Sequence, residues 1–238
     1  MQAMSGAIDG LIFDKDGTLF DFHATWARWT ADLITHLVAS HGVAADRLSA
    51  VLGFDPDSLQ FQNDSLVIAH TPDEIVQALL PLLPSVDHAE LCAEINVMAQ
   101  SVPVVEVVAL LPLFAQFRAD GYRIGLATND AEAVAMAHLQ ETGILGLFDF
   151  IAGSDSGFGG KPAPGMLNAF VRATGLDPAR VAMVGDSLHD LSAGRAAGMR
   201  TVAVLTGIAP AQVLAPLADV VLPDISHLPD WLAAQRSR

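Results

Sequence analysis

A short apolar run that ends in two carboxylates is the feature that most constrains this chain. Leu11-Ile12-Phe13 is typical of a buried strand, and Asp14, Asp16 and Gly17 follow it. An unpaired buried charge is very costly, so both aspartates are expected at the carboxyl end of the strand, where open α/β sheets bind their ligands. The alternative is an ordinary Asp-Gly turn. The elements that follow along the chain favour the strand-end site.

Predicted helices and strands alternate from residue 110 towards the end of the chain. The strands are expected at 122–127, 148–152, 181–184, 201–205 and 220–222. This alternation predicts an α/β fold with a Rossmann-like parallel sheet covered by helices on both faces. Residues 21–104 instead show helical spacing and no convincing strand, and they are too long for a loop. We therefore expect an α/β core of residues 1–20 and 105–238 with an inserted all-helical cap domain of residues 21–104.

Composition limits the partners of the chain. The 238 residues carry a net charge of −15, so neither nucleic acid nor an anionic membrane is an expected partner. No uninterrupted apolar stretch is long enough to span a bilayer, and no basic segment precedes an apolar one near Met1. A cytoplasmic protein is therefore expected. Cys92 is the only cysteine, which rules out an internal disulfide, and the only lysines are Lys15 and Lys161.

Polar residues end four of the expected strands. These residues are Asp14 and Asp16, Thr128 and Asn129, Ser154 and Asp155, and Gly185 and Asp186. A parallel sheet brings all these strand ends to one edge, where the carboxylates repel each other unless a cation lies between them. A hard dication with oxygen ligands is the simplest solution, so we expect a magnesium ion held by Asp14 and Asp186.

Such an edge suits the cleavage of a phosphate monoester. Asp14 would act as a carboxylate nucleophile, which splits one difficult step into two through an aspartyl-phosphate. Lys161 and the metal would shield the negative charges, and Thr128 would donate a hydrogen bond to the phosphoryl oxygens. Asp16 would protonate the leaving alkoxide and then activate water. That role requires a raised pKa, which the phosphoryl group and Asp14 are expected to provide.

These motifs resemble those of a known superfamily. Asp14-x-Asp16-Gly17-Thr18, Thr128, Lys161-Pro162 and Gly185-Asp186-x-x-x-Asp190 are similar, in that order, to the four motifs of the haloacid dehalogenase superfamily. The phosphoglycolate-phosphatase-like branch is the most similar, through Gly160 to Pro164 and through Gly185 to Met199. The likeness covers residues 1–20 and 110–210, and it extends to the cap only in position, length and helicity.

The resemblance implies a magnesium-dependent phosphatase, a monomer or homodimer, that acts on a small phosphorylated metabolite. The ester would be phosphoglycolate-like or a sugar phosphate. The main-chain carbonyl of Asp16 would join Asp14 and Asp186 on the metal, and Asn129 would supply backbone donors to the phosphoryl group beside Thr128. Lys161 would bridge Asp14 and the phosphate. Asp190 would hold Lys161 or the waters of the metal in place.

Three positions lie outside the shared motifs or depart from them. The side chain of Lys15 is expected to be exposed, with only its backbone N–H near the phosphate. Arg28 is expected to bind a carboxylate of the substrate, because its helix begins just after the catalytic loop. The family commonly has a Pro-Gly pair where the chain re-enters the core, and Val105-Glu106-Val107-Val108 replaces it here, so the hinge is expected to differ.

Two other functions remain open at this point. A phosphoglucomutase-like isomerase would share every core motif, but it would require a strong cap site for a second phosphate, which a cap without lysine disfavours. A non-catalytic phospho-receiver or scaffold would use Asp14 only to accept a phosphoryl group. Neither Asp16 nor an inserted cap would be necessary for that role.

Overall fold

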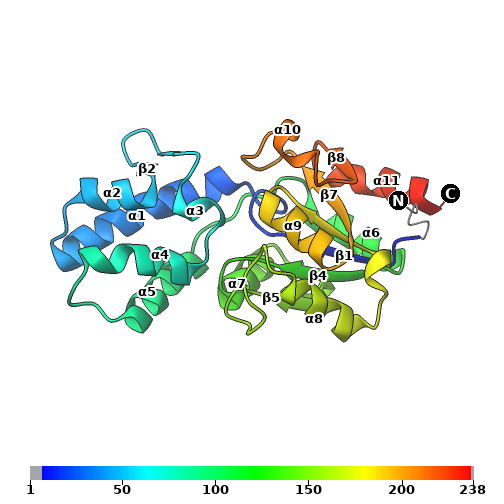
Figure 1. Ribbon diagram of the computed structural model, residues 1–238, viewed down its shortest axis with the longest axis horizontal. Coiled ribbons are helices and arrows are strands. Elements are labelled where there is room, and N and C mark those ends of the chain that lie inside the picture. Colours follow the sequence, from blue (N-terminus) through cyan, green and yellow to red (C-terminus); the bar gives the residue numbers. More distant parts are fainter. Residues whose placement is uncertain (1–6, 237–238) are drawn as a thin grey trace.

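The structure is a computed structural model that describes residues 7–236. Residues 1–6 and 237–238, the outer ends of the expected core, lie outside the described residues. Figure 1 shows two lobes, one made of the helices α1 to α5 and the other of a sheet with the remaining helices around it. The α/β fold expected from the sequence is confirmed. The domain boundaries at residues 20/21 and 104/105 stay a prediction.

A six-stranded parallel sheet forms the centre of the larger lobe. Its strands are β1 (Gly10–Phe13), β4 (Arg123–Ala127), β5 (Phe150–Ala152), β6 (Val181–Gly185), β7 (Arg200–Val204) and β8 (Val220–Leu222), in the spatial order β5-β4-β1-β6-β7-β8. β1 therefore lies between β4 and β6, and it is buried along its whole length. Because all strands run in one direction, residues that follow β1, β4 and β6 meet at one edge.

Helices cover both faces of this sheet. They are α6 (Leu110–Ala119), α7 (Glu132–Glu141), α8 (Gly165–Thr174), α9 (Leu188–Ala196), α10 (Ala211–Leu214) and α11 (Leu228–Arg236). Short 3-10 helices lie in this lobe at Leu145–Leu147, Pro178–Arg180 and Ile225–His227, and in the smaller lobe at Leu80–Leu82. Leu11 and Phe13 of β1 pack against α6, α7 and α11, whereas Ile12 packs against α8 and α9. Successive side chains of a strand point to opposite faces, so the apolar run of β1 serves both layers.

The smaller lobe is helical except for one short hairpin. Its helices are α1 (Phe22–His41), α2 (Ala45–Leu52), α3 (Leu66–Ala69), α4 (Pro72–Leu79) and α5 (His88–Gln100). β2 (Phe54–Asp55) pairs antiparallel with β3 (Gln60–Phe61), so the expectation of an all-helical cap is wrong at this point. The turn between them is held by the Asp55 carboxylate, which accepts hydrogen bonds from the Asp57 N–H and the Ser58 hydroxyl. Strands of two residues are too short to show an alternating pattern in the sequence.

The segment that returns from the cap to the core pairs with the segment that leaves the core for the cap. The carbonyl of Val105 accepts a hydrogen bond from the Asp21 N–H at 2.8 Å, and the Val107 N–H donates to the Leu19 carbonyl at 3.0 Å. Between them, the Glu106 carboxylate accepts from the Leu110 N–H at 2.9 Å and so caps the first turn of α6. The segment that replaces the expected Pro-Gly pair is therefore a short, hydrogen-bonded ribbon.

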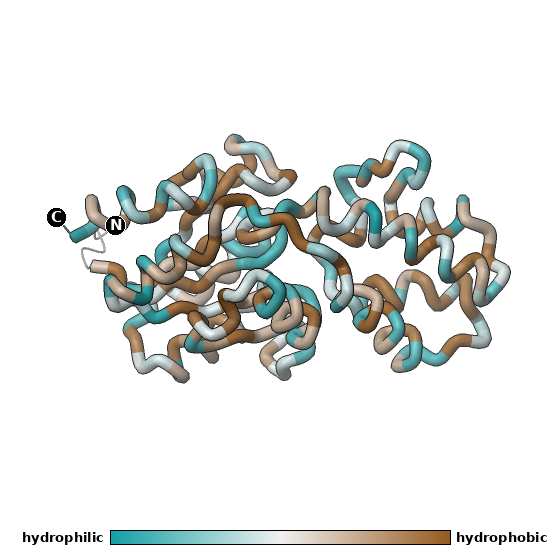
Figure 2. Tube along the Cα trace, turned by 180° about the vertical axis from the view of Figure 1, so that it is seen from behind, coloured by the Kyte–Doolittle hydropathy of each residue, from teal (hydrophilic) through white to brown (hydrophobic). Residues whose placement is uncertain are grey.

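The larger lobe has hydrophobic clusters on both faces of its sheet, and the cap has a cluster of its own. The cap cluster contains Trp26 and Trp29 of α1, and it extends onto Ala131 and Val134 near the start of α7. Figure 2 shows, from behind, the two lobes and the segments of chain that join them. Within residues 7–236, no helix is long and apolar enough to cross a membrane.

Candidate active site

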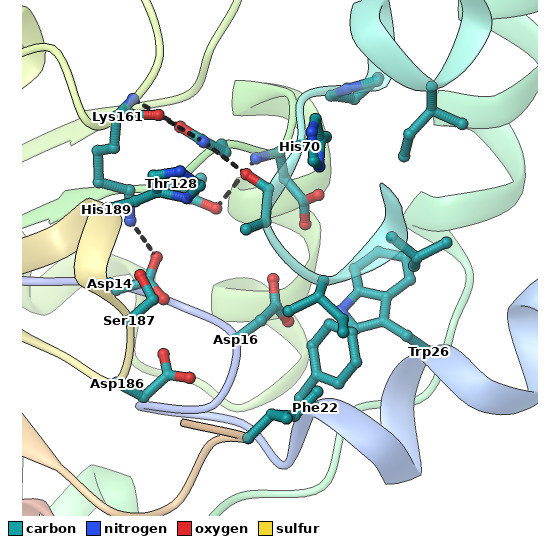
Figure 3. A pocket seen from close by; sticks show the side chains of 18 of the residues that line it. Asp14, Asp16, Phe22, Trp26, His70, Thr128, Lys161, Asp186, Ser187 and His189 are labelled. Carbon is teal, nitrogen blue, oxygen red and sulfur yellow. Dashed lines mark hydrogen bonds and ion pairs between the residues drawn. The ribbon is translucent and has the colours of Figure 1, made fainter. Parts of the chain in front are cut away.

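The polar residues at the strand ends gather around one cavity. They are Asp14 directly after β1, Thr128 and Asn129 directly after β4, Asp186 directly after β6, Lys161 in the loop between β5 and α8, and Asp190 in the first turn of α9. All of them except Asp190, together with Asp16, line a cavity of about 460 Å³. In Figure 3 the carboxylates of Asp14, Asp16 and Asp186 lie on one side of this space, and Phe22 and Trp26 of α1 face them.

Lys161 lies between two carboxylates. Its Nζ is 2.5 Å from Oδ1 of Asp14 and 2.6 Å from Oδ1 of Asp190, and its side chain is almost fully buried. Burial lowers the pKa of Lys161, but the two carboxylates outweigh burial and raise it above its usual value. Lys161 is therefore a fixed positive charge beside the proposed nucleophile.

Neighbouring side chains hold both ends of this ion pair. Oδ2 of Asp190 accepts hydrogen bonds from the N–H and the hydroxyl of Ser187, and the Ser187 hydroxyl accepts from the Asp190 N–H in return. This capping box fixes the start of α9 and aims Oδ1 of Asp190 at Lys161. Asn129 accepts from the Lys161 N–H at 2.7 Å and donates to the Lys161 carbonyl at 3.0 Å. Asn129 thus orients the backbone of Lys161 with its side chain.

Asp14 and Asp186 carry more negative charge than the site neutralises. Burial and then the Asp190 carboxylate raise the pKa of Asp14 to about 7, although Lys161 lowers it. Burial, with the charges of Asp190 and Asp14, raises the pKa of Asp186 well above its usual value. The Thr18 hydroxyl donates a long hydrogen bond, 3.4 Å, to Oδ1 of Asp186.

This arrangement fits a divalent cation. Ligand atoms of Asp14, Asp186 and Asp190 lie within 4.8 Å of one another. Both carboxylate oxygens of Asp190 already accept hydrogen bonds, from Lys161 and from Ser187, so Asp14 and Asp186 are the carboxylates that remain for a metal. Magnesium prefers oxygen ligands. The carboxylates of Asp14 and Asp186 supply such ligands, and the protein does not fully neutralise their charge. Gly17, at φ +76°, leaves room for the Asp186 carboxylate, because a Cβ at this position would lie 2.5 Å from that carboxylate.

Thr128 presents its hydroxyl at the same edge. The residue is 2% exposed, and its hydroxyl accepts a hydrogen bond from the Asp130 N–H at 3.1 Å. The hydroxyl proton is then directed away from that N–H and can be donated to a ligand oxygen. The Thr128 N–H itself donates to the Ala152 carbonyl of β5.

The expectation for Lys15 is wrong, because its side chain is fully buried. Its Nζ lies 2.8 Å from a carboxylate oxygen of Asp16 and 2.8 Å from one of Asp130, and it donates to Nδ1 of His138 at 3.0 Å. It also lies 5.1 Å from the ring centroid of Trp26. A lysine between two motif aspartates resembles a solvated charge in sequence, and only the fold brings Asp130, His138 and Trp26 to it.

The buried Lys15 changes the expected charge state of Asp16. Burial raises the pKa of Asp16, but the Lys15 ammonium and its hydrogen bond outweigh burial and hold the pKa below its usual value. The raised pKa expected from the sequence is therefore not found in the free enzyme. Burial raises the pKa of Asp130, the second partner of Lys15, to about 6, against the effect of Lys15.

His138 connects this cluster to the cap. Its Nε2 lies 3.0 Å from the carbonyl of Ala99 near the end of α5, and its Nδ1 accepts from Lys15. Nε2 is therefore the protonated nitrogen that donates to Ala99. Burial and then the Lys15 charge lower the pKa of His138 to about 4, so the ring is neutral near pH 7.

Two residues that were expected to contribute to the site lie outside the cavity lining. Arg28 lies on the exposed face of α1, where it pairs with Asp32 four residues later, and it does not line the cavity. Asp155 follows β5 as expected, but its carboxylate accepts from the Glu132 N–H at 2.8 Å and caps α7 instead. In both cases a local helix contact accounts for the side chain.

Comparisons with known proteins agree with this geometry. Residues 8–198 match the family model described as a haloacid dehalogenase-like hydrolase. A phosphoglycolate phosphatase of Mesorhizobium japonicum is 30% identical over 82% of this chain and 81% of its own length. A pyrophosphatase, PpaX, of Bacillus velezensis is 29% identical over 93% of this chain and 94% of its own.

Among solved structures, an HAD phosphatase from Thermococcus onnurineus superposes with a TM-score of 0.67 at 22% identity, over 94% of this chain and 98% of that one. That likeness supports the fold alone, whereas the family model spans most of the chain and includes all four motifs. The chain therefore belongs to the haloacid dehalogenase-like hydrolase family, in its phosphoglycolate-phosphatase-like branch, and is an enzyme of the phosphatase type.

Proposed function

We propose that this enzyme hydrolyses a small phosphate monoester with magnesium, through a phosphorylated Asp14. The observation that carries the proposal is the charge of the cavity floor. In the range 7–236, Lys161 is the one lysine or arginine that lines the cavity, against the carboxylates of Asp14, Asp16, Asp130 and Asp186. A dication is required before such a site binds a phosphate dianion.

Asp14 and Asp186, with the main-chain carbonyl of Asp16, are the groups that would hold magnesium. When bound, the ion would neutralise charge on the phosphoryl oxygens and on the carboxylates around it. The raised pKa values of Asp14 and Asp186 support this assignment, because they reflect buried negative charge that a cation would relieve.

Asp14 is the nucleophile of the proposed first step. One oxygen of its carboxylate attacks phosphorus, the bond to the alkoxide oxygen breaks, and an acyl phosphate forms on Asp14. Lys161, 2.5 Å from Asp14 and anchored by Asp190, orients the carboxylate and offsets the repulsion between it and the phosphoryl group. The Thr128 hydroxyl donates to a phosphoryl oxygen.

Asp16 transfers the protons. It gives a proton to the leaving alkoxide in the first step and takes one from the attacking water in the second, which releases phosphate and restores Asp14. In the free enzyme Lys15 keeps Asp16 ionised. The negative charge of a bound phosphoryl group raises the pKa of Asp16 and so opposes Lys15, which makes Asp16 an acid only when substrate is present.

The substrate classes expected from the sequence are phosphoglycolate-like esters and sugar phosphates, and relatives of similar identity carry different names, phosphoglycolate phosphatase and pyrophosphatase. The isomerase alternative gains no support, because no lysine or arginine from the described part of the cap lines the cavity to hold a second phosphate.

The test is phosphate release from a panel of phosphate monoesters, with magnesium and with a chelator. We expect release only with magnesium, and full recovery when excess magnesium follows the chelator. Asp14→Asn should lower kcat by at least about 1,000-fold, the size expected when a nucleophile is removed.

Asp155→Asn is the matched control, because this carboxylate lies at the same sheet edge and caps α7 instead of lining the cavity. It should keep turnover close to that of the parent enzyme. Metal-independent release, or an active Asp14→Asn enzyme, would contradict the proposed mechanism. Interconversion of sugar phosphates without release would favour the isomerase.

A further inference from the structure

We propose that the cap carries a second metal site, formed by Asp73, His88 and Cys92, which binds zinc or a similar thiophilic divalent cation. The site lies between α4 and α5, on a different part of the chain from the carboxylates proposed to hold magnesium. The ion would be a structural one that joins the two helices. This inference goes beyond the proposed phosphatase function and does not depend on it.

The three side chains come together because of where they lie on the two helices. Asp73 is in the first turn of α4, and His88 and Cys92 lie four residues apart at the start of α5. Residues at i and i+4 share one face of a helix. α4 and α5 lie side by side in the cap (Figure 1), so this face meets the start of α4. One ligand atom from each of the three residues lies within 4.8 Å of the other two.

The contacts among these groups are close to those of a metal site. Nε2 of His88 lies 3.1 Å from Oδ1 of Asp73, and Nδ1 of His88 lies 3.9 Å from Sγ of Cys92. Bonds of about 2.3 Å from zinc to sulfur and about 2.0 Å to nitrogen place two ligands of a tetrahedral site about 3.5 Å apart. The side chains of His88 and Asp73 are 39% and 58% exposed, so they can rotate to close the remaining gap without disturbing the core.

The donor atoms of the site select the metal. Thiolate sulfur and imidazole nitrogen are ligands that zinc prefers, whereas magnesium requires oxygen. Cys92 is the only cysteine of the chain, and its partly exposed sulfur faces the imidazole of His88. Zinc would therefore bind here and magnesium at the sheet edge, each at the site whose donor atoms suit it. One position of a tetrahedral zinc shell is left for water.

Binding of the ion involves the loss of one proton. Burial and then the charge of Asp73 raise the pKa of Cys92 above its usual value, so without a metal the thiol keeps its proton near pH 7. When the ion binds, the S–H bond breaks, a sulfur–metal bond forms and the proton passes to water. The thiolate and the Asp73 carboxylate together carry two negative charges, which offset the two positive charges of the ion.

The ion would act on the walls of the active-site cavity. Pro72 and Ile75 of α4 and Ile95 of α5 line that cavity. Asp73 and Cys92 belong to the same two helices and line a second cavity, of about 710 Å³. An ion held by both helices would fix their separation and with it the position of the apolar side chains that face the substrate.

Cobalt(II) is the probe for this site, because it takes the ligands of zinc and absorbs intensely in the near ultraviolet when bound to a thiolate. The reduced full-length protein should gain this band with about one equivalent of cobalt, and about one equivalent of zinc should remove it by displacement. Zinc should also raise the Tm by a few degrees. Asp186→Asn, which lacks a ligand of the proposed magnesium site, should show the same band and the same shift.

Matched variants connect the band to the three residues. Cys92→Ser and His88→Gln should each abolish the cobalt band and the zinc-dependent shift in Tm, and Asp73→Asn should weaken zinc binding at least about tenfold. Because these side chains are all at least partly exposed, the variants should fold as the parent protein does. His41→Gln and Asp46→Asn, which change exposed residues of α1 and α2 outside the cluster, should keep both signals.

Three outcomes would overturn the inference. One is the absence of the cobalt band from the parent protein. Another is a band that His88→Gln retains, which would indicate a thiol that binds metal alone. The third is a zinc-dependent shift in Tm that disappears in Asp186→Asn, which would place the zinc at the sheet edge. None of these results bears on phosphate release, so the phosphatase proposal is tested separately.

Discussion

At the scale of single residues, the buried Lys15 is the group whose role differs most from its appearance in the sequence. It neutralises Asp16 and Asp130, and it donates to His138, all inside the protein. Removing one partner of a buried ion pair leaves an uncompensated charge, which destabilises far more than the loss of a surface pair. Lys15 and Arg28 therefore offer a direct comparison between the two situations.

Lys15→Met should lower the free energy of unfolding by about 3 kcal/mol, because Asp16 and Asp130 stay buried without their cation. Urea denaturation followed by circular dichroism measures this loss. Arg28→Met, which removes an exposed pair at i,i+4 spacing, should cost no more than about 0.5 kcal/mol and should leave kcat and KM unchanged. Equal losses in the two variants would contradict the role assigned to Lys15.

At the scale of elements, side chains of the core hold the cap at defined points. His138 on α7 donates to the carbonyl of Ala99 near the end of α5, and Asn129 after β4 donates to the carbonyl of Ala69 at the end of α3. The ribbon around Glu106 completes the connection. The cap is therefore tied to the core through the residues that also build the site.

The lowered pKa of His138 predicts that the free energy of unfolding depends on pH. Its pKa in the folded protein, about 4, lies below its usual value of 6.5. This contribution to stability is therefore fully present above pH 6.5 and is lost as the pH falls towards 4. Between pH 7 and pH 5, the parent protein should lose about 2 kcal/mol more unfolding free energy than His138→Gln. Urea titrations at both pH values give this difference, and parallel losses would show that the ring does not resist protonation.

The hydrogen bond of Glu106 is expected to stabilise the connection between the lobes. Its carboxylate caps the first turn of α6 through the Leu110 N–H, and loss of such a cap costs about 1 kcal/mol. Glu106→Ala should lower the unfolding free energy by about that amount. Glu141→Ala, at the C-terminal end of α7 where a negative charge opposes the helix dipole, should not. A stable Glu106→Ala protein would show that the backbone ribbon alone fixes the start of α6.

At the scale of the whole molecule, a chain of net charge −15 concentrates several carboxylates at one sheet edge between two lobes. Burial and then the repulsion of Asp190 raise the pKa of Asp14 to about 7. A cation that binds there stabilises the folded protein, because the unfolded chain has no such site.

Magnesium should therefore raise the Tm. A ligand at 100 times its Kd adds about 2.7 kcal/mol to the stability of the folded state, so we expect a shift of several degrees in thermal denaturation. Asp186→Asn should abolish most of this shift, whereas Asp46→Asn on the exposed face of α2 should keep it. A shift of equal size in both variants would indicate general screening of charge.

The sequence by itself determined the fold and the composition of the cavity floor. Apolar runs with a polar residue at the end predict strands, and in a parallel sheet the residues after β1, β4 and β6 must meet, so Asp14, Thr128 and Asp186 were predictable as neighbours. Strand bounds agreed within about two residues, because Gly and Asp signals punctuate them. The resemblance to the family was also confirmed. The family motifs lie at or near these strand ends, which are the positions that the sequence pattern identifies.

Tertiary structure alone decided the environment of each side chain. Whether Lys15 is buried, whether Asp155 caps a helix, and whether Arg28 faces inwards depend on partners far away in the sequence or on the rotation of a helix about its axis. The positions of Trp29 and Asn96 in the cavity lining are of the same kind, because α1 and α5 must pack before either residue lines a cavity. Periodicity specifies which face of an element is apolar, but not which other element covers that face.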